Sequence, residues 1–222
     1  MALLGGPSFL PRTGKLPGQV IVLLHGVGAD GRDLVELAPL LSEHLPNAAF
    51  YAPDAPFACD MAPYGRQWFS LQDRRPESLL RGVRTVAPML DQFVAMLLDR
   101  HGLDERRLAL VGFSQGTMLA LYAAPRRAKP PAAVLGFSGA LIGAGDLATE
   151  ARSKPPVMLV HGDADDVVPV EAMFLAVGGL ASADIPVRWL LRPGLPHSID
   201  PEGITAGGRF LRSLLAGAGS RG

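Results

Sequence analysis

The stretch from Leu108 to Gly116 restricts the fold of this chain more than any other part of the sequence. The apolar run Leu108–Val111 predicts a buried strand, which leads directly into Gly112-Phe-Ser-Gln-Gly116 and then into a helix-forming segment. The pattern G-x-S-x-G between a strand and a helix is typical of a sharp turn that lifts the serine hydroxyl above a sheet. Glycines fit both sides of such a turn because the two backbones approach too closely for a Cβ. Ser114 is therefore the candidate nucleophile, and the competing interpretation is a serine that caps a helix in an ordinary turn.

Strands and helices are predicted to alternate along the rest of the chain. Residues 20–24 form a continuous apolar run, typical of a strand buried on both faces, and further strands are expected at 48–52, 132–137, 156–160 and 187–191. Helical spacing or helix-forming sequence occupies 32–44, 77–100, 117–124, a segment from about 169, and 201–215. This order predicts an α/β fold, with a mostly parallel central sheet and helices on both faces. We expect one domain over residues 1–222 with a loop-rich N-terminal segment at 1–17.

Two connecting segments and one proline carry further predictions. Residues 57–75 form a long irregular segment, and segments of that length without secondary structure tend to be functional. Its Trp68 and Phe69, together with Leu141, are the candidates for an apolar substrate-binding wall, although core packing competes as the role of Trp68. The 18 residues between Phe137 and Pro156 are too few for a large lid domain. Pro88 is expected to kink or split the helix at 77–100.

The composition excludes several classes of function. Basic and acidic residues balance at 21 each, which argues against nucleic acid or an anionic membrane surface as the main partner. A single cysteine, Cys59, excludes an internal disulfide framework, and without paired His/Cys spacing we expect no metal and no cofactor. The N-terminus lacks a basic signal region, and no apolar run reaches the ~20 residues of a membrane span. We expect a cytoplasmic protein with no stable membrane insertion.

Polar motifs follow several of the predicted strands, so they should meet at the carboxyl edge of the sheet. A serine hydroxyl needs a base, and the base needs a third group that holds its tautomer. His197 is the preferred base because it is the only histidine after the last strand, in the chain order Ser, acid, His. Asp163, Asp165 and Asp166 compete as the acid. Asp165 is favoured because it lies well inside the turn, whereas Asp163 is placed to shape that turn and Asp166 to cap it.

An oxyanion that forms on Ser114 needs preorganised N–H donors, each typically worth ~3 to 4 kcal/mol of barrier. One donor should be the backbone N–H of Gln115, directly after the nucleophile. The other should come from the loop after the first long strand, most simply the N–H of Val27. His25 and Gly26 would then shape that loop.

The same loop offers a different interpretation. Residues 26–31 form a literal G-x-G-x-x-G after a strand and before a helix, and Asp54 lies 23 residues beyond Gly31. This satisfies the dinucleotide fingerprint of a Rossmann-type oxidoreductase. That interpretation leaves the Ser114 turn, the aspartate cluster and the His197 loop unexplained. A third candidate is a hydrolase fold that binds a ligand without catalysis, and the intact Ser, Asp and His argue against it.

Five motifs together resemble the phospholipase/carboxylesterase family of α/β hydrolases, which includes acyl-protein thioesterases and small bacterial carboxylesterases. They are Leu23-Leu-His-Gly-Val-Gly-Ala-Asp30, Gly65-Arg-Gln-Trp-Phe69, Gly112-Phe-Ser-Gln-Gly-Thr117, His161-Gly-Asp-Ala-Asp-Asp-Val-Val-Pro169 and Pro196-His-Ser198. The resemblance implies Ser114, Asp165 and His197 as a catalytic triad and the N–H groups of Val27 and Gln115 as the oxyanion hole. It also implies hydrolysis of a small-molecule ester or thioester without a cofactor, often by a homodimer.

One residue departs from the thioesterase pattern. Those relatives usually carry Gly-Gly after the glutamine, whereas here Gly116 is followed by Thr117. With Arg-Gln-Trp-Phe in the 57–75 segment, the chain is more similar to the bacterial carboxylesterase branch. We therefore expect a serine carboxylesterase acting on short to medium acyl chains through an acyl-enzyme. The alternative is an acyl-protein thioesterase or lysophospholipase.

Overall fold

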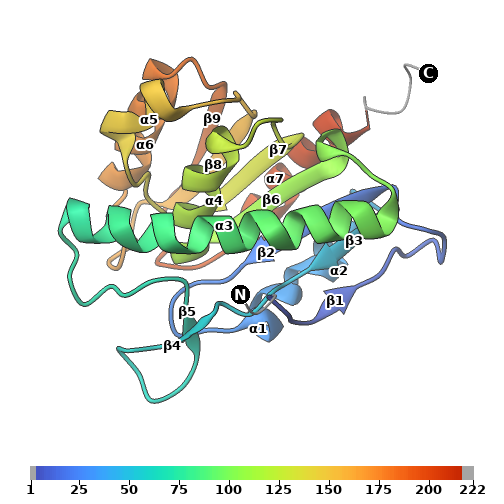
Figure 1. Cartoon of the computed structure of the whole chain (residues 1–222), viewed down its shortest axis with the longest axis horizontal. Helices are drawn as coiled ribbons and strands as arrows, with labels where there is room; N and C mark the ends of the chain where they lie inside the picture. The colour runs from blue at the N-terminus through green and yellow to red at the C-terminus, as the bar shows by residue number, and fades with distance from the viewer. Residues whose placement is uncertain (1–3, 217–222) are drawn as a thin grey trace.

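The computed structural model describes residues 4–216 and is built around a seven-stranded sheet (Figure 1). The strands lie in the order β1-β3-β2-β6-β7-β8-β9. All neighbours pair in parallel except β1, which pairs antiparallel with β3 at the edge. The mostly parallel sheet predicted from the sequence is thus confirmed. The strands are β1 Ser8–Phe9, β2 Gln19–Leu24, β3 Ala48–Tyr51, β6 Leu108–Phe113, β7 Ala133–Phe137, β8 Val157–Gly162 and β9 Val187–Arg192.

Helices cover both faces of the sheet, and each face has its own hydrophobic core. Strand β2 shows why: Val20, Val22 and Leu24 belong to the core under α3 and α4, whereas Ile21 and Leu23 belong to the core under α1, α2 and α7. Alternate residues of a strand point to opposite faces, so a strand between two helical layers must be apolar throughout. The helices are α1 Gly31–Val35, α2 Leu37–Ser42, α3 Pro76–His101, α4 Gln115–Arg126, α5 Ala144–Glu150, α6 Glu171–Ser182 and α7 Pro201–Leu215, with a 3₁₀ turn at Glu105–Arg107.

Two prolines act differently from the prediction. The helix expected at 32–44 is two short helices that meet at Glu36, because Pro39 has no N–H to bond the carbonyl of Val35. Pro88, by contrast, does not split α3, which runs through it without a break over 26 residues. A proline inside a helix costs about 3 kcal/mol, and burial of the apolar face of α3 in the core offsets this.

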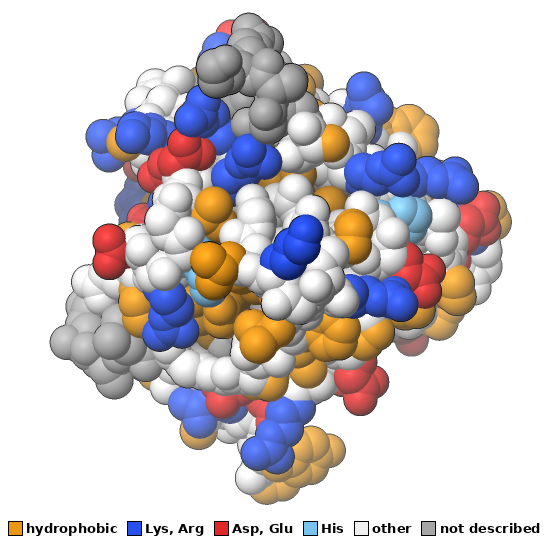
Figure 2. All heavy atoms as spheres, turned by 90° about the vertical axis from the view of Figure 1, so that its right-hand side faces the viewer, with side chains coloured by type: hydrophobic (Ala, Val, Ile, Leu, Met, Phe, Trp, Pro, Cys, Tyr) orange, Lys and Arg blue, Asp and Glu red, His pale blue; other side chains and the backbone are white. Residues whose placement is uncertain are grey.

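The segment at 57–75 is less irregular than expected, because it contains a small hairpin of β4 (Phe57–Ala58) and β5 (Arg66–Gln67). The hairpin projects at the bottom of Figure 1, and hydrophobic side chains reach the surface there in Figure 2. Phe57, Met61 and Tyr64 are its exposed large apolar residues. On the face in Figure 2, basic side chains are scattered among apolar and acidic ones.

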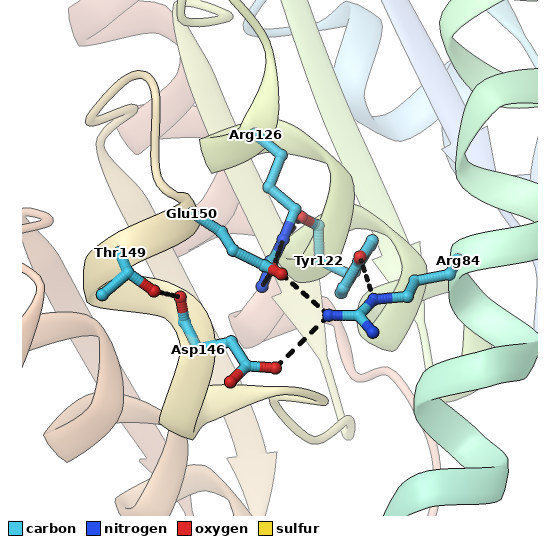
Figure 3. Close-up of polar contacts among 6 residues, drawn as sticks. All are labelled: Arg84, Tyr122, Arg126, Asp146, Thr149 and Glu150. Atoms are coloured by element: carbon cyan, nitrogen blue, oxygen red, sulfur yellow. Dashed lines mark hydrogen bonds and ion pairs between the residues drawn. The ribbon is translucent and has the colours of Figure 1, made fainter.

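Only the short helix α5 lies between β7 and β8, and charged side chains hold it in place (Figure 3). Arg84 of α3 bonds Glu150 at 2.7 Å and Asp146 at 3.3 Å, both on α5. Arg126 of α4 donates to the same Glu150 at 2.7 Å while its guanidinium lies 3.8 Å from the centre of the Tyr122 ring. Helix α5 is therefore a fixed wall joined to two neighbouring helices. In the part of the chain described, no helix has the length and hydropathy needed to cross a membrane.

Gly116 and Gly178 form a matched pair for testing the close approach of α4 to the sheet. A methyl group on Gly116 would overlap the carbonyl of Leu24 and lie 2.9 Å from the oxygen of His25, whereas one on Gly178 in α6 would meet nothing within 4 Å. We expect Gly116→Ala to lower the free energy of unfolding by several kcal/mol. Gly178→Ala should raise it by up to about 1 kcal/mol through helix propensity. Urea denaturation measures both, and equal effects would contradict the close approach.

Candidate active site

Ser114 lies at the junction of β6 and α4 with a backbone that few non-glycine residues adopt. Its φ is 52° and its ψ is −115°, and its N–H donates to the carbonyl of Phe137 at 2.9 Å. Holding such a conformation costs about 1–3 kcal/mol, so the surrounding structure must enforce it. The neighbouring glycines do so: a Cβ on Gly112 would collide with the backbone at Gly116 and Thr117. The turn is thus the strained strand-to-helix junction that the sequence predicts.

His197 and Asp165 come together from two different loops. The Nδ1 atom of His197 lies 2.8 Å and 3.0 Å from the two carboxylate oxygens of Asp165. Asp165 also accepts hydrogen bonds from the N–H groups of Val167 and Val168, at 3.0 Å and 2.9 Å. These bonds fix the carboxylate in the turn after β8, and the carboxylate in turn fixes the imidazole ring.

The other two aspartates of the cluster have different surroundings. Asp163 accepts a hydrogen bond from the N–H of Gly194 at 2.6 Å and so joins the β8 turn to the turn after β9. Asp166 is exposed. Of the three carboxylates considered from the sequence, Asp165 is the one that faces His197.

Two opposing effects act on the pKa of Asp165. Burial alone would raise the pKa, because it disfavours the charged carboxylate. Hydrogen bonds from His197, Val168 and Val167 outweigh burial and hold the pKa below its usual value. The group is therefore a carboxylate at neutral pH, as a partner for an imidazolium must be.

His197 lies against the residue that precedes Ser114. The imidazole ring of His197 lies over the ring of Phe113, with 4.8 Å between the ring centres, and Phe113 immediately precedes Ser114. Among residues 4–216 no hydrogen bond joins the Ser114 hydroxyl to His197. Catalytic hydrogen bonds are commonly long without substrate and shorten when it binds.

The loop after β2 lies against the serine. A Cβ on Gly26 would lie 3.4 Å from the Cβ of Ser114 and 3.3 Å from the ring of Phe113, so the two segments touch. The next residue is Val27, the candidate oxyanion donor, and the other candidate, Gln115, begins α4. Within the described chain, neither N–H has a protein acceptor. The first N–H groups of a helix lack partners inside it and can therefore serve a ligand.

The three predicted substrate-binding residues have different environments. Trp68 is fully buried and Phe69 nearly so, which places both in the core; the position of Trp68 gives no support to its predicted contact with substrate. Leu141 is partly buried and lines a cavity of about 380 Å³ between the start of α3 and α5. A larger cleft of about 640 Å³, which the sequence did not indicate, opens beside Val27. It is lined by Val27, Gly28, Ala29, Asp30, Asp33, Ala62, Tyr64 and Gly65.

The glycine-rich loop is used for packing and not for a dinucleotide. Asp54, which the Rossmann interpretation assigns to a ribose, accepts a hydrogen bond from the N–H of Gly31 at 2.9 Å. Gly31 itself sits against the carbonyl of Ala52, where a Cβ would overlap. A carboxylate already engaged in this way caps the helix start instead of reading a sugar. The strand order of the sheet is also not the 3-2-1-4-5-6 order of the Rossmann fold, which argues against the dinucleotide interpretation.

One buried histidine, His25, and one partly buried histidine, His101, should make the stability of the protein depend on pH. Burial lowers the pKa of His25 and of His101. Below about pH 6.5 the unfolded chain takes up protons that these folded side chains resist, so the free energy of unfolding should fall as pH falls. At pH 5.5 the part due to His25 is at most about 1.4 kcal/mol. Urea denaturation at pH 7.5 and 5.5 measures this change in the free energy of unfolding. The variant His101→Gln isolates the contribution of His25 from that of His101. Equal stability at both pH values would contradict the prediction.

Comparison with known proteins identifies the family of this chain. A profile of the phospholipase/carboxylesterase family matches residues 12–215. Acyl-protein thioesterase 1 of Gibberella zeae is 30% identical over 176 residues, covering 74% of this chain and 75% of that protein, and esterase YpfH of Escherichia coli K12 is 26% identical over 82% and 77%. The crystal structure of esterase PE8 superposes with a TM-score of 0.91 at 40% identity, over 96% of this chain and all of that one. The chain therefore belongs to the phospholipase/carboxylesterase family and is a serine hydrolase with the α/β-hydrolase fold.

Proposed function

We propose that this protein is a serine carboxylesterase in which Ser114, His197 and Asp165 form the catalytic triad. The observation that carries the proposal is the Asp165–His197 pair at 2.8 Å, whose imidazole packs on Phe113, the residue before a serine held at φ 52°. Because Asp165 occupies Nδ1 of His197, the other ring nitrogen, Nε2, is the one that serves Ser114. A carboxylate in this position keeps the proton on Nδ1 and leaves Nε2 free to accept one.

The reaction follows from these positions. Ser114 Oγ attacks the ester carbonyl and its proton passes to His197 Nε2, which gives a tetrahedral oxyanion. The carbon–oxygen bond to the alcohol then breaks, and the leaving alkoxide takes the proton from His197. Water repeats the sequence on the acyl-enzyme: His197 takes a proton from water, the acid leaves and Ser114 recovers its hydrogen.

The backbone N–H groups of Val27 and Gln115 are the proposed oxyanion donors. Support comes from their lack of a protein acceptor in the described chain and from the contact of Gly26 with Ser114. Two fixed donors require no reorganisation as negative charge develops on the carbonyl oxygen.

Two cavities limit the size of the substrate. The cleft of about 640 Å³ begins at Val27, so a group attached to a carbonyl that reaches this donor can extend into it. The cavity beside Leu141 is smaller, at about 380 Å³. Among residues 4–216 the chain between β7 and β8 contains only the short helix α5 and no lid domain, and we propose short to medium acyl chains as substrates.

Acyl-protein thioesterase activity is the second candidate, favoured by the 30% identity to the Gibberella zeae protein of that name. The departure at Thr117 has a local explanation. Its hydroxyl donates to the carbonyl of Phe137 at 2.8 Å, and its side chain fills the space beside Gly136 and Gly139. Hydrolysis of an oxoester and a thioester with the same acyl chain separates the two candidates by their relative kcat/KM.

The first test is hydrolysis of p-nitrophenyl esters with acyl chains of two to sixteen carbons. Ser114→Ala should lower kcat by several orders of magnitude because the attacking atom is gone. Ser213→Ala, in α7 and outside the site, is the matched control and should keep the wild-type rate. Equal activity of wild type and Ser114→Ala on every ester would refute the proposed nucleophile.

The acid is tested by a pair of neighbouring substitutions. Asp165→Asn should lower kcat by about 10³ to 10⁴, because the amide no longer holds the required imidazole tautomer. Asp166→Asn changes the same chemistry on an exposed side chain and should leave kcat within about twofold. The reverse order of effects would assign the acid to Asp166 instead.

A further inference from the structure

Trp68 connects the two segments that carry the proposed oxyanion donors. Its backbone N–H donates to the side-chain oxygen of Gln115 at 2.8 Å, and its indole N–H donates to the carbonyl of His25 at 2.9 Å. The side-chain Nε2 of Gln115 in turn donates to the carbonyl of Phe69 at 2.7 Å. Trp68, His25 and Gln115 are all fully buried. One residue of the 57–75 segment is therefore bonded both to the start of α4 and to the loop after β2.

The hydrogen bonds of His25 fix its tautomer. Its Nε2 lies 3.0 Å from the backbone nitrogen of Ala55, and since an amide N–H can only donate, Nε2 must be the acceptor. The proton is therefore on Nδ1, which donates to the carbonyl of Gly26 at 2.7 Å. Burial lowers the pKa of His25, which keeps the ring neutral and so preserves this pattern.

These bonds set the orientation of two successive peptide groups. The carbonyl of His25 belongs to the peptide that precedes Gly26, and the indole of Trp68 holds it. The carbonyl of Gly26 belongs to the peptide whose N–H is that of Val27, and the ring of His25 holds it. In a trans peptide the C=O and N–H point in opposite directions, so fixing the carbonyl of Gly26 aims the N–H of Val27 away from His25.

We infer that Trp68 is a positioning residue whose indole N–H keeps the Val27 N–H aimed at the oxyanion, while its backbone N–H anchors the helix start that presents Gln115. This inference rests on the proposed function, because it assumes that both N–H groups serve Ser114. Trp68 does not touch the substrate. It acts through His25, which it also contacts with 5.4 Å between the ring centres.

The bond from the indole N–H of Trp68 to the carbonyl of His25 matters because the next residue is Gly26. The loop itself supplies one long bond to the peptide between Gly26 and Val27, from the N–H of Ala29 to the carbonyl of Gly26 at 3.4 Å. Because a glycine can rotate its flanking peptides with little steric cost, that bond alone defines the direction of the Val27 N–H weakly. Without the indole N–H, the buried carbonyl of His25 has lost its donor and gains by turning toward another one. Such a turn changes the dihedrals of Gly26 and misdirects the donor. Loss of one oxyanion donor costs about 10² to 10³ in kcat, so misdirecting it should cost at least about tenfold.

The test uses the two tryptophans of the chain, Trp68 and Trp189. Trp68→Phe removes the indole N–H and keeps an aromatic ring, whereas Trp189→Phe makes the same change at a half-exposed side chain on β9, which contacts Phe174. We expect Trp68→Phe to lower kcat for the best p-nitrophenyl ester at least tenfold with KM changed less than threefold. Trp189→Phe should match the wild type in both.

A second measurement reports on the oxyanion hole itself. Each protein is given an ester and its thiono analogue, in which sulfur replaces the carbonyl oxygen. A sulfur anion is larger and accepts hydrogen bonds more weakly, so the wild type should prefer the oxygen ester strongly. In Trp68→Phe this preference in kcat/KM should shrink by about the same factor as kcat falls. A fall in kcat with an unchanged preference would overturn the inference, as would wild-type kinetics in the folded variant.

A closer isostere covers the case in which Trp68→Phe does not fold. In the Trp189→Phe background Trp68 is the sole tryptophan, so growth on 3-benzothienylalanine, in which sulfur replaces the indole N–H, alters that position alone. The same loss of kcat and of oxygen preference is expected, and wild-type values would overturn the inference. Ser114→Ala in the same assays separates a failure of the proposed function from a failure of the inference about Trp68. If Ser114→Ala keeps activity, the proposed function fails. If the wild type is active and the Trp68 variant is unaffected, only the role of Trp68 is removed.

Discussion

The close approach of α4 to the end of β2 is the constraint on which the rest of the site depends. Gly116 lies so near the carbonyl of Leu24 that no side chain fits between them. This contact brings the start of α4 beside the loop after β2, and it forces the chain to reverse within the Ser114 turn. The strain at Ser114, the Gln115 N–H that has no acceptor in the described chain, and the contact of Gly26 with Ser114 all follow from one short distance between two backbones.

Much of the architecture could be predicted because it depends on patterns along the chain. A strand buried on both faces is apolar at every position, so β2 and β6 were evident from their composition. Helix α7 lies where its proline start and apolar spacing indicate, at Pro201–Leu215. The break at Glu36 was missed because the apolar spacing at Leu34, Leu37 and Leu41 continues across it, so the pattern gives no sign of the bond that Pro39 cannot make. The continuity of α3 through Pro88 was missed because tertiary burial, which spacing does not quantify, overrides a local penalty.

Some residues of the candidate site could likewise be predicted from the sequence, and others could not. Chain order and turn chemistry pointed to Ser114, His197 and Asp165, and the geometry places Asp165 against His197. The role of Trp68 could not be read from the sequence, because its partners Gln115 and His25 lie 47 and 43 residues away. An aromatic residue in a long loop looks the same in sequence whether it faces a ligand or the core. The cleft beside Val27 was also invisible, since it forms between the loop after β2 and the β4–β5 hairpin.

That hairpin is bonded to the loop after β2 as if it were an additional strand. The N–H of Gly28 donates to the carbonyl of Arg66 at 2.8 Å, and the N–H of Arg66 donates to the carbonyl of Ala29 at 2.9 Å. One wall of the cleft and the segment holding Val27 are thus a single mechanical unit. A bulkier substrate that pushes the hairpin outward pulls on the same backbone that faces Ser114. In the proposed site, substrate size and turnover are therefore expected to be coupled, and widening the cleft from the hairpin side is expected to move Val27 as well.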